Sequence, residues 1–172
     1  PSASNSKDGV ITPHLAPWLR HFKGIPGVEG KEPHRKIVVL RPGAKTRKLT
    51  NSTELLLALK GWETVVLENM TIREQMKTFA EATHIVAAHG AGLVNLLWCK
   101  PGTKVIEIQD TKMIHKKVYP ILSHHLGLKH ELYLADTVPI KLKDGKKPKG
   151  IKRISDLINF KIDIPDLLKY LD

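Results

Sequence analysis

Hydrophobic residues in this chain gather into short runs that alternate with segments of helical spacing. The first run, at residues 36–41, is β-branched and lacks a polar residue at every second position. That pattern is typical of a strand covered on both faces, so it predicts a sheet in the middle of the fold. The predicted strands lie at residues 36–41, 63–67, 84–88, 104–108, 129–134 and 159–162.

Capping residues and glycines mark where helices begin and end between these strands. Thr71 and Glu74 have the spacing of a capping box, Asp163 precedes the last helix, and Gly61 and Gly127 end two others. The predicted helices lie at residues 12–22, 51–60, 71–82, 92–98, 113–126 and 164–171. Strands and helices in turn, joined by short connections, predict an α/β fold with a Rossmann-like parallel sheet and helices on both faces.

The length of 172 residues is enough for one domain with a buried core. We expect a polar N-terminal segment with a lead-in helix at residues 1–30 and a Rossmann-like domain at residues 31–172. The N-terminal sequence is polar and has no initiator Met. We therefore expect a piece of a longer polypeptide rather than a signal peptide. Cys99 is the only cysteine, which excludes an internal disulfide and a cluster of thiolate ligands.

Much of the net charge of +11 lies in a basic loop at residues 141–153, which holds seven basic residues and one acid. A lysine-rich segment with glycine and proline is typical of a solvated loop. The alternatives are a patch for nucleic acid and an electrostatic funnel for an anionic substrate. The segment has no aromatic residue for base stacking and one arginine, which counts against nucleic acid.

A glycine turn, His89-Gly90-Ala91-Gly92, directly follows the apolar run at residues 84–88. Missing side chains let the backbone approach a ligand, and a helix that begins there directs free N–H groups at an anion. The carboxyl end of a parallel strand is also where open α/β sheets bind ligands. The turn therefore predicts a phosphate site, although it lacks the Lys-Ser/Thr of a P-loop.

The nine histidines also raise the question of a metal site. His124 and His125 are adjacent on a predicted helix and point about 100° apart, so they do not form the i, i+4 pair of a zinc site. We expect them and His130 to be ordinary surface or interface residues. Asn51 and Asn69 begin N-glycosylation sequons, but such sequons also occur by chance and fix no cellular location.

Several further residues and short motifs follow one another along the chain. They are Arg41, Arg47 and Asn51, then Glu68 and Gln75, the glycine turn with Leu93 and Asn95, Pro101-Gly102-Thr103, Val105-Ile106-Glu107-Ile108, and Phe160, Ile162, Asp163, Leu167 and Leu168. Together they resemble the C-terminal half of family-61 glycosyltransferases, which include plant xylosyl- and arabinosyltransferases and animal protein O-linked N-acetylglucosaminyltransferases. Two departures are Leu40, where many members have serine, and the basic loop, for which we identify no counterpart.

The resemblance implies that this chain is the donor-binding half of a GT-B type transferase with two Rossmann-like domains. It implies inverting transfer of a sugar from a nucleotide sugar, with UDP the expected nucleotide, to a glycan or protein acceptor. The acceptor-binding N-terminal domain would lie outside this chain, which alone would be catalytically incomplete. The location would be the Golgi or endoplasmic reticulum lumen in a eukaryote and the cytoplasm in a virus or bacterium.

The leaving pyrophosphate of such a donor needs positive charge or a metal ion. The chain has no Asp-x-Asp motif, so we expect no metal cofactor. Guanidinium groups bind phosphate through paired hydrogen bonds, which makes Arg41 and Arg47 the predicted pyrophosphate partners. Gly90, Ala91 and Gly92 would supply the backbone cradle. The alternative for both arginines is an ordinary surface position.

The remaining candidates each have a structural alternative. His89 would bind a donor phosphate or sugar hydroxyl, or act as the base, unless it is a buried histidine that holds the turn. Glu107 would take the ribose hydroxyls, unless it pairs with a lysine or with His115 in the chain. Glu68 would contact the base or ribose, or else cap its loop, and Asn95 would bind the donor or stabilise the turn. A non-catalytic basic module that binds nucleic acid or another polyanion remains the alternative function.

Overall fold

The computed structural model describes residues 32–111, 117–140 and 157–171. The predicted helix at 12–22, residues 113–116 of the helix predicted at 113–126, and the basic loop at 141–153 lie outside the described residues. Within the described residues that helix begins at Val118. The division of the chain at residue 30 therefore stays a prediction.

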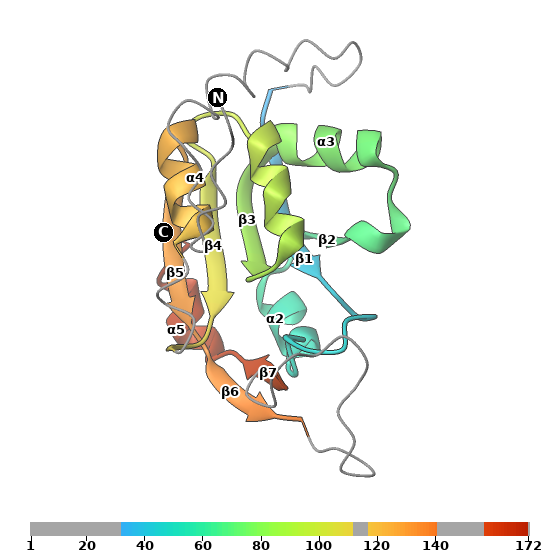
Figure 1. Cartoon of the computed structure of the whole chain (residues 1–172), viewed down its shortest axis with the longest axis vertical. Coiled ribbons are helices and arrows are strands. Elements are labelled where there is room, and N and C mark those ends of the chain that lie inside the picture. Colours follow the sequence, from blue (N-terminus) through green and yellow to red (C-terminus); the bar gives the residue numbers. More distant parts are fainter. Residues whose placement is uncertain (1–31, 112–116, 141–156, 172) are drawn as a thin grey trace, which may run out of the picture.

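Five parallel strands form the centre of the domain, and all five were predicted from apolar runs (Figure 1). The order across the sheet is β2-β1-β3-β4-β5, and each neighbouring pair is parallel. This arrangement confirms the α/β, Rossmann-like fold class. The strands are β1 (Arg35–Leu40), β2 (Glu63–Val66), β3 (Ala82–Ala88), β4 (Lys104–Gln109) and β5 (Lys129–Leu134).

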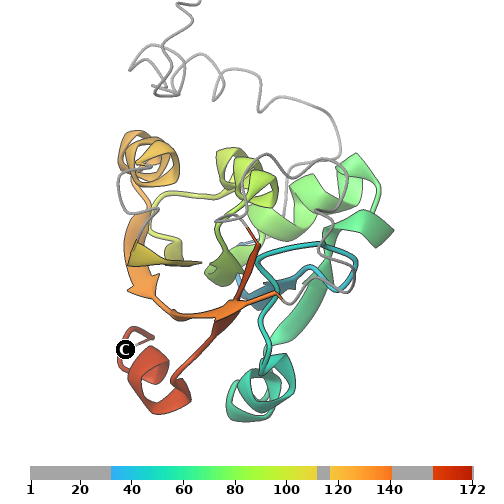
Figure 2. The same ribbon diagram turned by 60° about the horizontal axis from the view of Figure 1, so that its bottom comes forward.

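Helices cover both faces of this sheet, as expected, and make a three-layered fold. The α-helices are α2 (Ser52–Ala58), α3 (Ile72–Ala80), α4 (Val118–Leu126) and α5 (Ile164–Leu168), and the 3-10 helices are η1 (Leu67–Asn69) and η2 (Ala91–Trp98). Figure 2 shows α3, η2 and α4 on one face, with α2 and the red α5 on the other. Phe79 is fully buried on the first face and Phe160 on the second.

The chain changes direction across the sheet between β1 and β3. After β1 it crosses by α2 to β2 at one edge, and after β2 it returns by α3 on the opposite face to β3. Right-handed crossovers that run in opposite directions need opposite faces of a sheet. The chain therefore leaves β1 and β3 toward opposite faces, and ligands of open α/β sheets bind at the carboxyl edge between two such strands. We call this place between the ends of β1 and β3 the crevice.

Local capping signals predicted the helix ends well. The Thr71 hydroxyl accepts a hydrogen bond from the backbone N–H of Glu74 at 3.3 Å, and the Glu74 carboxylate accepts from the Thr71 N–H at 2.7 Å. Asp163 caps α5 by accepting from the Asp166 N–H at 3.0 Å. Gly127 ends α4 with a φ of 70°, a left-handed conformation that favours glycine.

The segment after the glycine turn is a helix, but of the 3-10 type. The N–H of Leu93 bonds to the carbonyl of Gly90, and the N–H of Cys99 to that of Leu96, both across three residues. A 3-10 helix places residues three apart on one side. Leu93 and Leu96 are both buried, so this tighter winding directs their side chains into the core together.

The prediction of one parallel sheet was wrong for the last strand. β7 (Ile158–Lys161) pairs antiparallel with β6 (Asp136–Pro139) in a separate two-stranded sheet. Periodicity missed β6 because it has four residues and ends in proline, which is a weak strand signal. β7 also bridges to the loop after β1, where Leu49 pairs with Phe160.

Asn51 does not cap α2 with its side chain. Its amide instead donates to the carbonyl of Ile162 at 2.8 Å and accepts from the Ile162 N–H at 3.0 Å. This buried pair joins the start of α2 to the chain just after β7. The side chain of the Asn51 sequon is therefore committed to a structural contact.

Candidate functional site

Arg41 and His89 follow the two strands that flank the crevice. Arg41 comes directly after β1 and His89 directly after β3, and these strands are paired with Val39 opposite Ala87. A Cβ placed on Gly90 would lie 3.0 Å from Nη1 of Arg41, so the missing side chain makes room for the guanidinium. Nη1 of Arg41 is buried and has no hydrogen-bond partner among the described residues.

Arg47 approaches the same turn from the loop after β1. Its Nη1 donates to the carbonyl of His89 at 3.0 Å. The backbone N–H of Arg47 donates to the carbonyl of Ile158 at the start of β7, and its φ of 60° is left-handed. The antiparallel pair β6–β7 thus helps to hold the second arginine beside the glycine turn.

Glu107 occupies the centre of a buried hydrogen-bonded chain on the face of the sheet that α4 covers. One carboxylate oxygen accepts from Nδ1 of His89 and the other from Nε2 of His130 at 2.9 Å. Nδ1 of His130 lies 2.7 Å from the hydroxyl of Ser123 on α4. Since the carboxylate can only accept, His89 presents an Nδ1–H to it and has Nε2 left for another partner.

The charge of Glu107 is retained despite its burial. Burial alone would raise the pKa of its carboxyl group. Hydrogen bonds from His130 and His89, together with the electrostatic attraction of these two side chains, outweigh burial and lower the pKa. Tyr119 packs edge-on against His89, with ring centroids 5.4 Å apart. Burial, with a smaller contribution from the Glu107 charge, raises the pKa of the Tyr119 hydroxyl.

A pocket of about 370 Å³ lies beside Arg41 on the α3 side of the crevice. Its polar lining residues are Arg41, Glu68, Gln75 and Asn95, and Gly92 contributes backbone. The Gln75 amide accepts from Asn95 at 3.0 Å and donates to the carbonyl of Leu67 at 3.0 Å, so Gln75 ties α3 to the glycine turn. Glu68 is exposed at the rim.

Comparisons with known proteins identify the family of this chain. The family model described as Glycosyltransferase 61 matches residues 1–106, which include Arg41, Arg47 and the glycine turn. The chain belongs to glycosyltransferase family 61. The resemblance seen in the sequence is therefore confirmed.

Two curated relatives of this family member are themselves named as glycosyltransferases. One is beta-1,2-xylosyltransferase RCN11 of Oryza sativa subsp. japonica, 28% identical over 137 residues, or 74% of this chain and 23% of the relative. The other is protein O-linked-mannose beta-1,4-N-acetylglucosaminyltransferase 2 of Tetraodon nigroviridis, 29% identical over 113 residues, or 63% of this chain and 19% of the relative. The matched part of this chain spans less than a quarter of either relative.

The structure of this family member brings most of the predicted site residues together. Arg41, Arg47, His89 and Gly90 meet at the crevice, and Gly92, Asn95 and Glu68 line the adjoining pocket. Asn95 donates to Gly92 and Gln75, so its amide N–H groups hold the turn. Glu107 is fully buried and both its oxygens bond to imidazoles, so the predicted ribose contact finds no support in this geometry.

Three residues around His89 and Glu107 were not predicted from the sequence. His130 and Ser123 extend the buried hydrogen-bonded chain, and Tyr119 packs against His89. His130 lies opposite Val105 on the neighbouring strand, two residues before the position opposite Glu107. Val105, Glu107 and His130 therefore share a face, which the strand register reveals and the spacing along the chain does not. The contact with Glu107 corrects the expectation that His130 is an ordinary surface residue, since its side chain is 5% exposed.

The described residues contain neither a cluster of metal ligands nor a membrane-spanning helix. In the ranges 32–111, 117–140 and 157–171, no group of three or more His, Cys, Asp and Glu side chains could hold a metal ion. Within the same ranges, no helix has the length and apolar character needed to cross a membrane.

Proposed function

We propose that this domain binds the nucleotide-sugar donor of a family-61 glycosyltransferase, with a UDP-sugar as substrate. The observation that carries the proposal is the guanidinium of Arg41, whose Nη1 is buried and unpartnered beside Gly90 at the switch point of the sheet. A buried N–H donor without a hydrogen-bond partner is costly, and an acceptor oxygen of a bound anion offsets that cost. The switch point is where open α/β sheets bind nucleotides.

In this proposal the pyrophosphate lies across the glycine turn. Arg41 donates from the β1 side, and Arg47, which already holds the His89 carbonyl, adds a second positive charge. The backbone of Gly90, Ala91 and Gly92 leads into η2, whose first N–H groups are available to an anion. The adjoining pocket, with Glu68 at its rim, receives another part of the donor.

His89 contacts the donor through Nε2, because Glu107 holds Nδ1. A neutral imidazole in this tautomer accepts a hydrogen bond from a sugar hydroxyl, and the protonated form donates to a phosphate oxygen. Glu107 and His130 act as positioning residues that fix the ring. This assignment replaces the ribose contact for Glu107.

The reaction we propose is direct displacement with inversion at the anomeric carbon. The acceptor hydroxyl forms the new C–O bond and loses its proton to a base, while the bond to the pyrophosphate oxygen breaks and UDP leaves. The arginines neutralise the charge that develops on UDP, which is the role of the metal ion in metal-dependent transferases. The base and the acceptor surface belong to an N-terminal domain of the GT-B type outside this chain.

Calorimetric titration with UDP and UDP-sugars in the presence of a chelator tests this proposal. We expect micromolar binding that falls at least about tenfold in Arg41→Ala, because a charge-assisted hydrogen bond contributes about 1.5–3 kcal/mol. Lys161→Ala removes a charge from the exposed side of β7 and is the matched control, with affinity unchanged.

Two results would overturn the proposal. One is UDP binding that Arg41→Ala leaves intact. The other is salt-sensitive binding to random DNA without any nucleotide binding, which would favour the alternative of a non-catalytic polyanion-binding module.

A further inference from the structure

Four basic residues lie side by side at the amino edge of the sheet, opposite the proposed donor site. Lys36 on β1 pairs in register with His84 on β3, His84 with Lys104 on β4, and Lys104 with Lys129 on β5. Residues in register share a face, and neighbouring strands are about 4.8 Å apart. We call these four residues the basic row.

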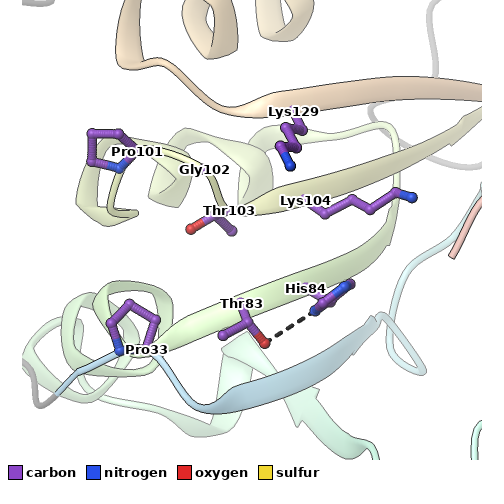
Figure 3. Close-up of a pocket in the computed structure, with 8 residues that line it drawn as sticks. All are labelled: Pro33, Thr83, His84, Pro101, Gly102, Thr103, Lys104 and Lys129. Atoms are coloured by element: carbon purple, nitrogen blue, oxygen red, sulfur yellow. Dashed lines mark hydrogen bonds between the residues drawn. The ribbon is translucent and has the colours of Figure 1, made fainter. Parts of the chain in front are cut away.

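A pocket of about 370 Å³ opens at this edge (Figure 3). Figure 3 shows Thr83 and His84 on β3, with Lys104 on β4 and Lys129 on β5 across the pocket from them. The lining residues are Pro33, Thr83, His84, Pro101, Gly102, Thr103, Lys104 and Lys129. Three members of the basic row therefore face one solvent-filled space.

Like charges placed directly opposite each other on a sheet are destabilising. Among the described residues, the acid that pairs with the basic row is Glu131, whose carboxylate lies 3.6 Å from Nζ of Lys104 and is half exposed. Trp62 covers the far end of the row, with Nζ of Lys36 5.9 Å from its ring centroid and the His84 ring 5.8 Å away. The row therefore keeps an excess of positive charge, which costs stability.

His84 is held in one tautomer beside these charges. The Thr83 hydroxyl donates to the carbonyl of Arg35 at 3.0 Å, so it accepts from Nδ1 of His84 at 3.1 Å. Nε2 is then the nitrogen that gains a proton when the ring becomes charged. Burial, followed by the charges of Lys36, Lys104 and Lys129, lowers the pKa of His84.

We propose that the amino-edge pocket is a second ligand site, which binds a phosphate or sulfate group through Lys104, Lys129 and the protonated form of His84. Lys36 contributes its charge from the neighbouring strand. The ligand donates no atoms and undergoes no reaction there. This site is independent of the donor site, because it lies at the opposite edge of the sheet and uses none of its residues.

NMR titration of the His84 ring with pH tests this proposal, with sulfate as the probe because its charge is constant between pH 5 and 8. Sulfate is exchanged for chloride at constant ionic strength, so that general screening stays the same. We expect sulfate to raise the midpoint of the His84 titration, since a bound anion favours the imidazolium. His84→Gln assigns the resonance among the nine histidines.

Variants separate this site from other anion sites of the chain. We expect the double variant Lys104→Gln/Lys129→Gln to weaken the sulfate binding reported by His84 about tenfold or more. The single variant Lys129→Gln should weaken it less. Lys161→Gln on β7 is the charge-matched control and leaves the response unchanged. Arg41→Ala also leaves it unchanged, so a failure of the donor proposal does not affect this result.

A His84 midpoint that is equal in sulfate and chloride overturns the proposal, and so does a sulfate response that survives in the double variant. A parallel titration with glucose 6-phosphate identifies the source of the anion. Tighter binding than sulfate assigns the site to a phosphorylated sugar, and weaker binding assigns it to the free ion.

Discussion

The position of Arg41 depends on a single missing side chain. Nη1 would lie 3.0 Å from a Cβ on Gly90, a distance tighter than an ordinary contact, so a larger residue there requires the guanidinium to move. Gly90 itself has an extended backbone with a φ of 168°, which other residues also adopt. Its role is therefore to make space beside Arg41 rather than to permit an unusual backbone.

Gly90→Ala should lower the affinity for UDP about tenfold, because the new methyl displaces the guanidinium and costs about one charge-assisted hydrogen bond. We expect the free energy of unfolding to change by less than about 1 kcal/mol, since the backbone is compatible with alanine. Calorimetric titration and urea unfolding measure the two effects. Gly43→Ala is the control, because nothing lies within 4 Å of a Cβ there. Equal affinities of the two variants would contradict this account of Gly90.

Glu107 fixes the orientation of two imidazole rings, because its carboxylate accepts a hydrogen bond from His89 and another from His130. Glu107→Gln replaces one acceptor oxygen by an NH2 group that faces the N–H of His89 or His130, so we expect a loss of about 1–3 kcal/mol in unfolding free energy. Nitrogen shifts of the His89 ring should show that its Nδ1–H tautomer is no longer fixed. Glu68→Gln, at an exposed carboxylate, should change stability by less than about 0.5 kcal/mol. An unchanged His89 tautomer would refute the positioning role.

At the scale of elements, the antiparallel pair β6–β7 holds the loop after β1 against the domain. Arg47, Thr50 and Asn51 each bond to backbone groups of residues 158–162, and Arg47 reaches the His89 carbonyl from this anchored loop. The antiparallel pair thus supports one side of the crevice that the parallel sheet creates.

Asn51→Ala leaves both the N–H and the carbonyl of Ile162 without their amide partner in a buried place. We expect a loss of about 2–4 kcal/mol in unfolding free energy, measured by urea unfolding, because two buried polar groups become unsatisfied. Thr53→Ala on the exposed face of α2 is the control and should change stability by less than about 0.5 kcal/mol. A loss for Asn51→Ala no larger than that of the control would refute the anchoring role.

The elements that the sequence predicted are those whose signals are local. Apolar runs marked the five parallel strands, and the capping box at Thr71 marked the start of α3. β6 could not be predicted, because four residues ending in Pro139 become a strand only through pairing with a segment about 20 residues further along. The same limit hid the contact of Glu107 with His130, which depends on the register of β4 and β5.

At the scale of the whole molecule, positive charge lies at both ends of the sheet. Arg41 and Arg47 follow β1 at the carboxyl edge, while the basic row crosses the amino edge. Two carboxylates pair with other basic groups of the domain: Glu63 forms an ion pair with Arg35, and Glu107 accepts hydrogen bonds from His89 and His130. The stability of the domain therefore depends on these carboxylates staying ionised.

Acid should destabilise the domain in two stages. His84 has a lowered pKa in the folded state, so the unfolded chain binds its proton first and stability falls as the pH drops below about 6.5. The pKa values of Glu107 and Glu63 are also lowered, so their contribution is present above about pH 4.5 and is lost as the pH falls through their folded values. Urea unfolding between pH 7 and 3 measures this dependence. A stability that rises between pH 7 and 5 would contradict it.

The central claim is that UDP binds at the switch point between β1 and β3, and a crystal structure of the chain with UDP tests it most directly. The account predicts the pyrophosphate within hydrogen-bonding distance of the Arg41 guanidinium and the backbone of the glycine turn, with Nε2 of His89 facing the ligand. A pyrophosphate bound at the amino edge, or one that leaves Arg41 without a contact, would contradict it.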